Sequence, residues 1–214
     1  IDVATKMLAG AKFRNAGQVC VSPTRFLVQE KVYNTFVDKF TRAARHLKVG
    51  NGLEEGVNMG ALANPRRMTA MRANVEDAKR HGAKVATGGE RIGAAGNFFQ
   101  PTVLTEVPND AKVMNEEPFG PLAIVNPFKS FDDAVSEANR LPYGLAAYAF
   151  TRSAKTAAAI AHEIQSGMVT INHLGLALPE VPFGGVKDSG YGFEGGSEAI
   201  EAYIQTRFAT LADL

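Results

Sequence analysis

The single cysteine of this 214-residue chain, Cys20, has the clearest potential for chemistry. It ends the segment 13–20 (FRNAGQVC), which lies between a helix-like and a strand-like stretch, and loops at such places often carry functional groups. A thiol becomes nucleophilic where positive charge or backbone donors favour its thiolate. Gly17 gives the backbone the freedom to approach a substrate closely. The alternative for Cys20 is a small buried hydrophobic residue, because free cysteines are often buried.

Two other segments concentrate unusual residues. Segment 116–121 (EEPFGP) sets two acids before a proline-framed aromatic turn, and a carboxylate there could accept hydrogen bonds from the hydroxyls of a nucleotide ribose. Its alternative is a polar turn with the phenylalanine in the core. Segment 182–196 is dense in glycine, which predicts tight packing or close backbone approach. No complete GxGxxG follows a strand there, so by itself this segment predicts a structural role.

Composition narrows the classes of function. The charges are mixed and sum to +1, which gives no indication of a nucleic-acid partner. No apolar run approaches the roughly 20 residues of a membrane-spanning helix. One cysteine cannot form an intramolecular disulfide, which favours a reducing compartment such as the cytoplasm. The four histidines do not cluster with Cys20, so no metal site is expected, and His81 before Gly82 is expected to cap a helix.

Helix-like and strand-like patterns alternate along the chain, which predicts an α/β fold with an open, mainly parallel sheet flanked by helices. The first helix is expected to bury Val3, Met7, Leu8 and Ala11, which recur at helical spacing. The segment 202–208 has strand propensity outside the alternation and is expected to pair with something beyond the domain. The expected strands are 24–29, 83–87, 101–104, 122–125, 145–150 and 167–172, and the expected helices are 1–13, 32–44, 64–81, 131–139 and one around 157–161.

Together and in this order, the three segments resemble the aldehyde dehydrogenase superfamily. Segment 13–20 is similar to its cysteine motif, 116–121 to its Glu-Glu-x-Phe-Gly-Pro element and 182–192 to its Pro-Phe-Gly-Gly-x-Lys-x-Ser-Gly-x-Gly element. The resemblance covers essentially the whole chain. It implies a cysteine-bearing catalytic domain over 1–195 and a tail over 196–214 whose strand joins another subunit in a dimer or tetramer.

The resemblance also implies a role for each matching residue. Cys20 attacks the aldehyde to give a thiohemiacetal, hydride passes to NAD or NADP, and water cleaves the thioester. Glu117 holds the nicotinamide ribose and Phe119 borders the nicotinamide. Glu194 lies in a proton path near the thiol, and Phe183 lines the aldehyde pocket. The family's dinucleotide-binding domain, general-base glutamate and oxyanion asparagine precede this region, so these residues alone are expected to have little or no activity.

Within the superfamily, the succinate-semialdehyde dehydrogenases are the most similar. Arg14 matches their arginine for the substrate carboxylate, which a guanidinium can grip with two parallel hydrogen bonds; the alternative is a surface arginine. Ala177 and Leu178 stand where those enzymes usually have serines, which leaves another semialdehyde or a neutral aldehyde open. Two other classes also remain open: a non-catalytic binding or assembly module with the same fold, and a cysteine-dependent esterase.

Overall fold

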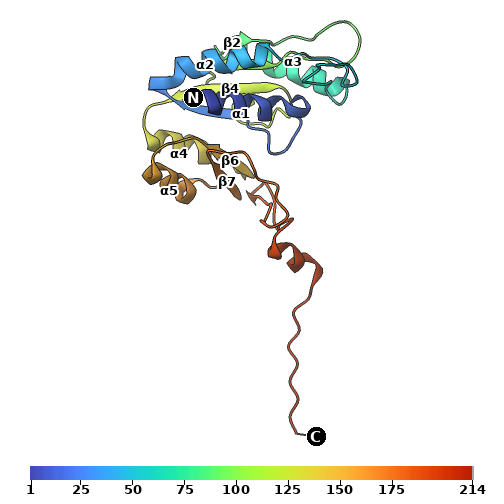
Figure 1. Cartoon of the computed structure of the whole chain (residues 1–214), viewed down its shortest axis with the longest axis vertical. Helices are drawn as coiled ribbons and strands as arrows, with labels where there is room; N and C mark the ends of the chain where they lie inside the picture. The colour runs from blue at the N-terminus through green and yellow to red at the C-terminus, as the bar shows by residue number, and fades with distance from the viewer. Residues whose placement is uncertain (214) are drawn as a thin grey trace.

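The computed structural model describes residues 1–213, and its N-terminal part is built around a four-stranded sheet. The strand order is β1-β4-β3-β2, with β4 parallel to β1 and to β3, and with β2 antiparallel to β3. Three helices flank this sheet (Figure 1). The predicted mainly parallel α/β fold is therefore confirmed. The elements are α1 (Asp2–Phe13), β1 (Arg25–Gln29), α2 (Glu30–Arg45), α3 (Pro65–Arg80), β2 (Lys84–Thr87), β3 (Thr102–Thr105) and β4 (Leu122–Phe128).

The C-terminal part forms a second, smaller layer below the first in Figure 1. Its strands β6 and β7 pair in parallel and are connected by the helix α5. The short β5 pairs antiparallel with β8. The sequence pattern did not predict the β5–β8 pair, because strands of two residues leave no periodicity to detect. The elements are α4 (Phe131–Asn139), β5 (Tyr143–Gly144), β6 (Ala146–Ala149), α5 (Ala154–Glu163), β7 (Met168–Ile171) and β8 (Val186–Lys187).

Helix ends follow the local signals in the sequence. Asn64 caps α3 by accepting a hydrogen bond from Arg67 N at 3.2 Å, and proline occupies the first turn of the helix. His81 is the C-cap of α3, and its Nδ1 lies 2.8 Å from Asp77 O, which confirms the predicted cap. Ser130 and the N3 residue of α4 form a reciprocal capping box. None of the helices of residues 1–213 is long and apolar enough to cross a membrane.

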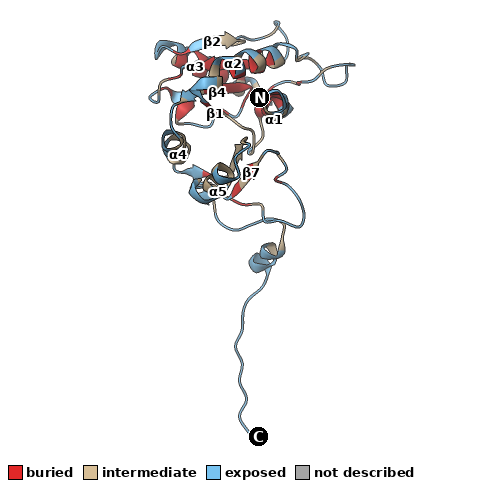
Figure 2. Cartoon of the chain, turned by 60° about the vertical axis from the view of Figure 1, so that its left-hand side comes forward, coloured by how far each residue is buried: buried red, intermediate tan, exposed pale blue. Residues whose placement is uncertain are grey.

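The hydrophobic core lies between the four-stranded sheet and its helices, where buried residues concentrate in Figure 2. Phe36 and Phe40 of α2 are 7% and 0% exposed and stack with ring centroids 5.5 Å apart, so both rings lie in the core. Phe26 of β1 packs on Phe40 at 4.9 Å, and Phe13 of α1 at 6.1 Å. These rings fix the end of α1 and the start of β1 relative to each other, and the Cys20 segment spans the gap between them.

The buried face of α1 differs from the predicted one. Val3 is 68% exposed, and of the four residues expected in the core only Leu8 is buried. A lysine, Lys12, takes the position one turn after Leu8 and is 0% exposed. Lys12 was not among the residues expected in the core, so the buried face of α1 is turned away from the predicted one. The buried residues of α1 are Thr5, Leu8, Ala9, Lys12 and Phe13.

The chain ends in an extended tail that leaves the body of the molecule, as Figures 1 and 2 show. A short 3-10 helix, Ser197–Tyr203, precedes it. Residues 204–213 are extended and exposed. The predicted segment 202–208 therefore overlaps the 3-10 helix at its start and is extended beyond it, and its pairing with another subunit stays a prediction.

Candidate active site

Cys20 lies on a strained loop between α1 and β1. The short 3-10 segment η1 (Arg14–Gly17) follows α1, and within it Asn15, Ala16 and Gly17 all have left-handed backbone angles, with φ of 50°, 53° and 70°. Such angles cost on the order of 1–2 kcal/mol for each residue with a side chain, and they concentrate at functional sites. The Cys20 side chain is a free thiol and is exposed. The alternative of a buried hydrophobic cysteine is therefore wrong, because residues 1–213 leave Cys20 exposed.

Tyr148 of β6 holds the loop just after the thiol. Its hydroxyl donates a hydrogen bond to Val21 O at 2.7 Å. Burial raises the pKa of Tyr148 to about 12, while the Arg14 guanidinium lowers that pKa and the Cys20 side chain raises it. Both side chains therefore act on the same phenol. Tyr148 therefore stays protonated at neutral pH and donates its hydrogen bond to the loop after Cys20.

Lys12 ties the same loop to α1 from the inside. Ser22 Oγ donates to Lys12 O at 3.2 Å, and Lys12 Nζ donates to Thr24 Oγ1 at 3.3 Å. Burial lowers the pKa of Lys12 to about 7, and the negative charge of Glu117 partly opposes that shift. The backbone carbonyl and the side-chain ammonium of Lys12 therefore both hold the loop after Cys20.

The second motif packs directly on the first. A Cβ added to Gly17 would lie 2.2 Å from Gly120 O, so no larger residue fits there without moving the backbone. On the far side, a Cβ on Gly120 would lie 2.2 Å from Met71 Sδ of α3. Segments 13–20 and 116–121, about a hundred residues apart in sequence, consequently form one block with α3 behind them.

Glu117 and Phe119 lie in a turn that α3 fixes. Arg67 of α3 donates through one guanidinium nitrogen to Pro118 O and to Phe119 O, the latter at 3.4 Å. Phe119 has a left-handed φ of 44° and is 37% exposed. Burial raises the pKa of the Glu117 carboxyl, and the charges of Lys12 and Arg67 lower it. The phenylalanine is not in the core, so the alternative of a turn with a buried aromatic is wrong.

A hollow of about 420 Å³ opens between these two motifs and the start of α3. Arg67 Nε lies buried beside it with no acceptor among residues 1–213. An aromatic face and amide groups are chemistry that suits a nucleotide ring and its hydroxyls. The lining residues are Asn15, Gln18, Ala61, Ala63, Asn64, Arg67 and Phe119.

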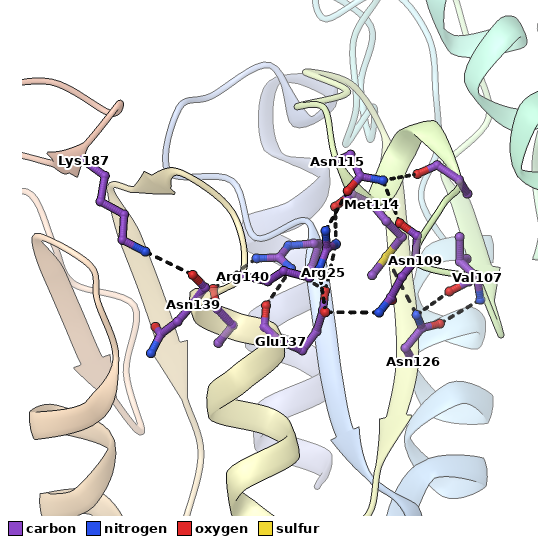
Figure 3. A network of polar contacts seen from close by, with 12 residues as sticks. Arg25, Val107, Asn109, Met114, Asn115, Asn126, Glu137, Asn139, Arg140 and Lys187 are labelled. Carbon is purple, nitrogen blue, oxygen red and sulfur yellow. Dashed lines mark hydrogen bonds and ion pairs between the residues drawn. The ribbon is translucent and has the colours of Figure 1, made fainter.

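The third motif forms a loop of its own. Phe183 and Glu194 face each other in an isolated antiparallel bridge, with N–O distances of 2.6 and 2.8 Å. Lys187 Nζ donates to Asn139 O at 3.1 Å and to Leu141 O at 3.3 Å, as Figure 3 shows for the first of these bonds. No hydrogen bond or ion pair joins Phe183 or Glu194 to Cys20 within the described residues. The structure brings these two predicted residues to each other and not to the thiol.

A polar network joins the two layers (Figure 3). Arg25 of β1 pairs with Glu137 of α4 at 2.6 Å, and Arg140 pairs with the other oxygen of that carboxylate at 2.8 Å. Arg140 also donates to Asn115 Oδ1 at 2.7 Å and to Met114 O at 3.0 Å. Because Asn115 precedes the 116–121 turn and β1 follows the thiol loop, one carboxylate steadies the supports of both motifs.

Comparison with known proteins decides the family. Residues 1–209 match the family model described as "Aldehyde dehydrogenase family". This chain belongs to the aldehyde dehydrogenase family. The resemblance inferred from the three motifs is thereby confirmed, and so is the fold class that it implied.

Named relatives show how far the similarity extends within this family. The putative 4-(hydroxymethyl)benzenesulfonate dehydrogenase TsaD2 of Comamonas testosteroni is 47% identical over 209 residues, which cover 97% of this chain and 43% of that protein. A probable succinate-semialdehyde dehydrogenase [NADP(+)] of Sinorhizobium fredii is 42% identical over 214 residues, covering 100% and 44%. The crystal structure of succinate-semialdehyde dehydrogenase from Burkholderia pseudomallei superposes with a TM-score of 0.92 at 42% identity, covering 94% and 42%. The chain spans less than half the length of these relatives.

Sequence reasoning missed three side chains that hold these motifs: Lys12, Arg67 and Tyr148. Lys12 left a weak signal, because a lysine one turn after Leu8 interrupts an otherwise apolar face. Arg67 and Tyr148 left none, since each reaches the site through a tertiary contact from another element. All three act on the backbone or charge of residues that the motifs did identify.

Proposed function

We propose that the full-length polypeptide containing these residues is an NAD(P)-dependent aldehyde dehydrogenase whose substrate carries an anionic group. One observation carries the proposal: the exposed Cys20 thiol and the Glu117–Phe119 turn belong to one block, because Gly17 and Gly120 are in direct contact. A nucleophile and a coenzyme-binding carboxylate held at fixed separation are what a two-substrate reaction at one centre needs.

In the proposed reaction, the Cys20 thiolate adds to the aldehyde carbon, and its own backbone N–H helps to stabilise the resulting oxyanion. Glu117 and Phe119 would hold the nicotinamide ribose and ring, and the bound coenzyme supplies the acceptor for the substrate hydride. Loss of that hydride leaves a thioester on Cys20. Water then cleaves the thioester, which releases the carboxylic acid and regenerates the thiol. Glu194 is proposed to move the proton, and Phe183 to line the aldehyde pocket.

Arg14 is proposed to bind the anionic group of the substrate. It is exposed, and its charge acts on Tyr148, whose hydroxyl bonds the loop after Cys20. The names of two similar proteins specify a semialdehyde with a carboxylate and an aromatic sulfonate, and a guanidinium can grip either group with two hydrogen bonds. Succinate semialdehyde is the first substrate to test. Leu178 is 54% exposed and apolar, and an aromatic sulfonate is the second substrate to test.

The test uses the full-length protein with Arg14→Ala and, as a control, Arg72→Ala, which removes an exposed arginine of α3. Specificity constants are compared for succinate semialdehyde, 4-formylbenzenesulfonate and a neutral aldehyde, with NAD and NADP separately. Loss of a partner for a bound charge should cost at least about 2 kcal/mol, or about 30-fold, for the anionic substrates only. A preference that survives in Arg14→Ala removes the role of Arg14 and leaves the dehydrogenase assignment standing.

The rival classes make different predictions. A non-catalytic module of this fold predicts that iodoacetamide alkylates Cys20 no faster than it alkylates a free thiol at neutral pH. An esterase predicts turnover of activated esters without nucleotide.

We also propose a homo-oligomer formed through the tail, because Ile204, Phe208 and Leu211 are 56%, 88% and 78% exposed there. A reducing compartment, the cytoplasm, is proposed from the single cysteine.

A further inference from the structure

The side-chain amide of Gln18, two residues before Cys20, bonds to backbone groups on two separate segments of the chain. Its Nε2 donates to Asn15 O at 3.1 Å and to Ala61 O at 3.4 Å, and its Oε1 accepts from Ala63 N at 2.8 Å. Both N–H donors and the carbonyl oxygen of the amide therefore have protein partners. Only the orientation with the oxygen toward the Ala63 N–H satisfies all three bonds, which together are called the amide clamp.

The far end of the amide clamp is firmly held. The segment 61–63 is more than 40 residues from Gln18 in sequence and leads into α3. Its central residue, Leu62, is 3% exposed and donates its N–H to Asn97 O at 2.8 Å. Asn64, which follows, is the N-cap of α3. The clamp therefore joins the loop of the cysteine to a part of the backbone that the core and a helix already fix.

A closed turn carries the thiol directly after the amide clamp. Ser22 N donates to Val19 O at 2.9 Å, which closes a turn with Cys20 and Val21 at its centre. On the other side of the thiol, the Tyr148 hydroxyl holds Val21 O at 2.7 Å. The cysteine thus lies between two tethers, the amide clamp before it and the tyrosine bond after it.

The amide clamp also crosses one side of the hollow beside the site. The loop of the cysteine contributes Asn15 and Gln18 to the lining of this hollow, and the segment before α3 contributes Ala61 and Ala63. The clamp bonds these two parts of the lining to each other. It therefore fixes the distance between the loop that carries the thiol and the segment that leads into α3.

We propose that Gln18 is a positioning residue, whose amide holds the Cys20 turn at a fixed place relative to the hollow. This inference rests on the proposed function, in which a coenzyme ring lies beside Phe119 in that hollow. Hydride transfer needs the substrate carbon on the thiol and the coenzyme ring in register, and a misplacement of about 1 Å can cost about 100-fold in rate. Alkylation of the thiol by a small reagent needs no such register.

The test uses the full-length protein and four variants. Gln18→Met keeps the length of the side chain and removes all three bonds of the clamp. Gln18→Asn keeps the amide but is one methylene too short to span the two segments, and it covers the case in which Gln18→Met does not fold. Gln18→Glu keeps the acceptor for Ala63 N and removes both donors. Gln165→Met is the matched control, because Gln165 is exposed and bonds through its backbone N–H.

Three quantities are measured on each protein. Deuterium uptake of the Ala63 amide, in coenzyme-free protein and in cold, mildly acidic buffer, reports on the clamp itself. Rapid-mixing kinetics give the rate of hydride transfer in a single turnover, and aldehyde deuterated at its carbonyl carbon gives the isotope effect on kcat. The rate of alkylation by iodoacetamide reports on access to Cys20.

We expect Gln18→Met and Gln18→Asn to speed exchange at Ala63 about fivefold, the effect of one lost hydrogen bond. Hydride transfer should slow at least about tenfold and the isotope effect on kcat should grow. The alkylation rate should stay close to that of the wild type, because the closed turn and the tyrosine bond remain. Gln18→Glu should keep Ala63 protected and recover most of the hydride-transfer rate, since it retains the shortest of the three bonds. Gln165→Met should match the wild type throughout.

The outcomes that would overturn the inference are distinct from failure of the proposed function. Unchanged exchange at Ala63 in Gln18→Met would remove the clamp, and faster exchange with an unchanged rate of hydride transfer would remove its positioning role. Alkylation and hydride transfer that slow in equal proportion would leave Gln18 as support for the loop alone, which also contradicts positioning. If the wild type reduces no coenzyme with any aldehyde, the proposed function and the positioning role both fail. The clamp is still decided by the exchange at Ala63.

Discussion

Replacing Lys12 by methionine should make the protein more stable, and the gain should depend on pH in a way that identifies its cause. Burial lowers the pKa of Lys12 from 10.5 to about 7. Between these values the unfolded chain binds one more proton than the folded chain at this residue. The free energy of unfolding of the wild type therefore rises with pH across this window, and it carries the full penalty below about pH 7.

The magnitude follows from the size of the pKa shift. A lowering from 10.5 to about 7 corresponds to about 5 kcal/mol at 1.36 kcal/mol per pKa unit. The variant loses the hydrogen bond from Nζ to Thr24, which offsets about 1 kcal/mol of that gain. Lys12→Met should thus be several kcal/mol more stable than the wild type near about pH 6.5. Its advantage should shrink by about 1.4 kcal/mol for each pH unit above 7.

The assay must report on this part of a longer polypeptide. Full-length wild type, Lys12→Met and Lys6→Met are equilibrated in urea at about pH 6.5, about pH 7.5 and about pH 9, and each sample then receives a short deuterium pulse. Mass spectrometry of the peptide that contains β4, a fully buried strand at its start, gives the fraction of molecules unfolded there. Comparison at equal pH cancels the other titrating groups. An advantage of Lys12→Met that is the same at all three pH values would refute the buried ammonium as its origin.

Other substitutions test the geometry of the site. Gly17→Ala should slow alkylation of Cys20 at least tenfold, because its Cβ would lie 2.2 Å from a backbone oxygen and its φ is 70°. Gly10→Ala is the control, because a Cβ there has nothing within 4 Å. It should leave the alkylation rate unchanged and stabilise α1 by about 0.5–1 kcal/mol. Tyr148→Phe removes the 2.7 Å bond to Val21 O and should cost about 1 kcal/mol of stability and a few-fold in the alkylation rate; equal rates would show that this bond does not hold the loop. Glu137→Gln removes the charge of a carboxylate that is 17% exposed and pairs with two arginines, so urea unfolding should show a loss of stability of about 2 kcal/mol. High salt screens these ion pairs in the wild type, so the difference in stability between wild type and variant should be smaller there.

Much of the fold was predictable because local patterns determined it. The helix predicted at 131–139 has the bounds Phe131–Asn139 in the structure, and the expected strands at 24–29 and 167–172 match β1 and β7 to within a residue at each end. Each of these elements has a periodic apolar pattern and a clear start or stop signal, and both are properties of neighbouring residues. The split into two layers was not predicted, because it depends on which strands pair at a distance.

The candidate site was predictable only in part, for a related reason. The motifs identified Cys20, Arg14, Glu117 and Phe119, and the contact between Gly17 and Gly120 joins the two segments that carry them. Glycines carry such information because a close approach of two backbones requires them. The residues that tune the site, by contrast, act through space. A buried lysine and an exposed one have the same letter in the sequence, and only tertiary packing separates Lys12 from Lys6.

The thiol loop combines several features that each lower stability. Asn15 and Ala16 are left-handed without being glycine, and Lys12 carries a charge that the core does not solvate. Features that lower stability are kept in proteins where function needs them, although removing them would make the fold more stable. The loop is held by what surrounds it, from α1, β6 and the 116–121 turn, and not by its own conformational preference. If this is correct, substitutions that relax the loop should stabilise the protein and impair Cys20 together, and Lys12→Met is the variant in which both effects can be measured at once.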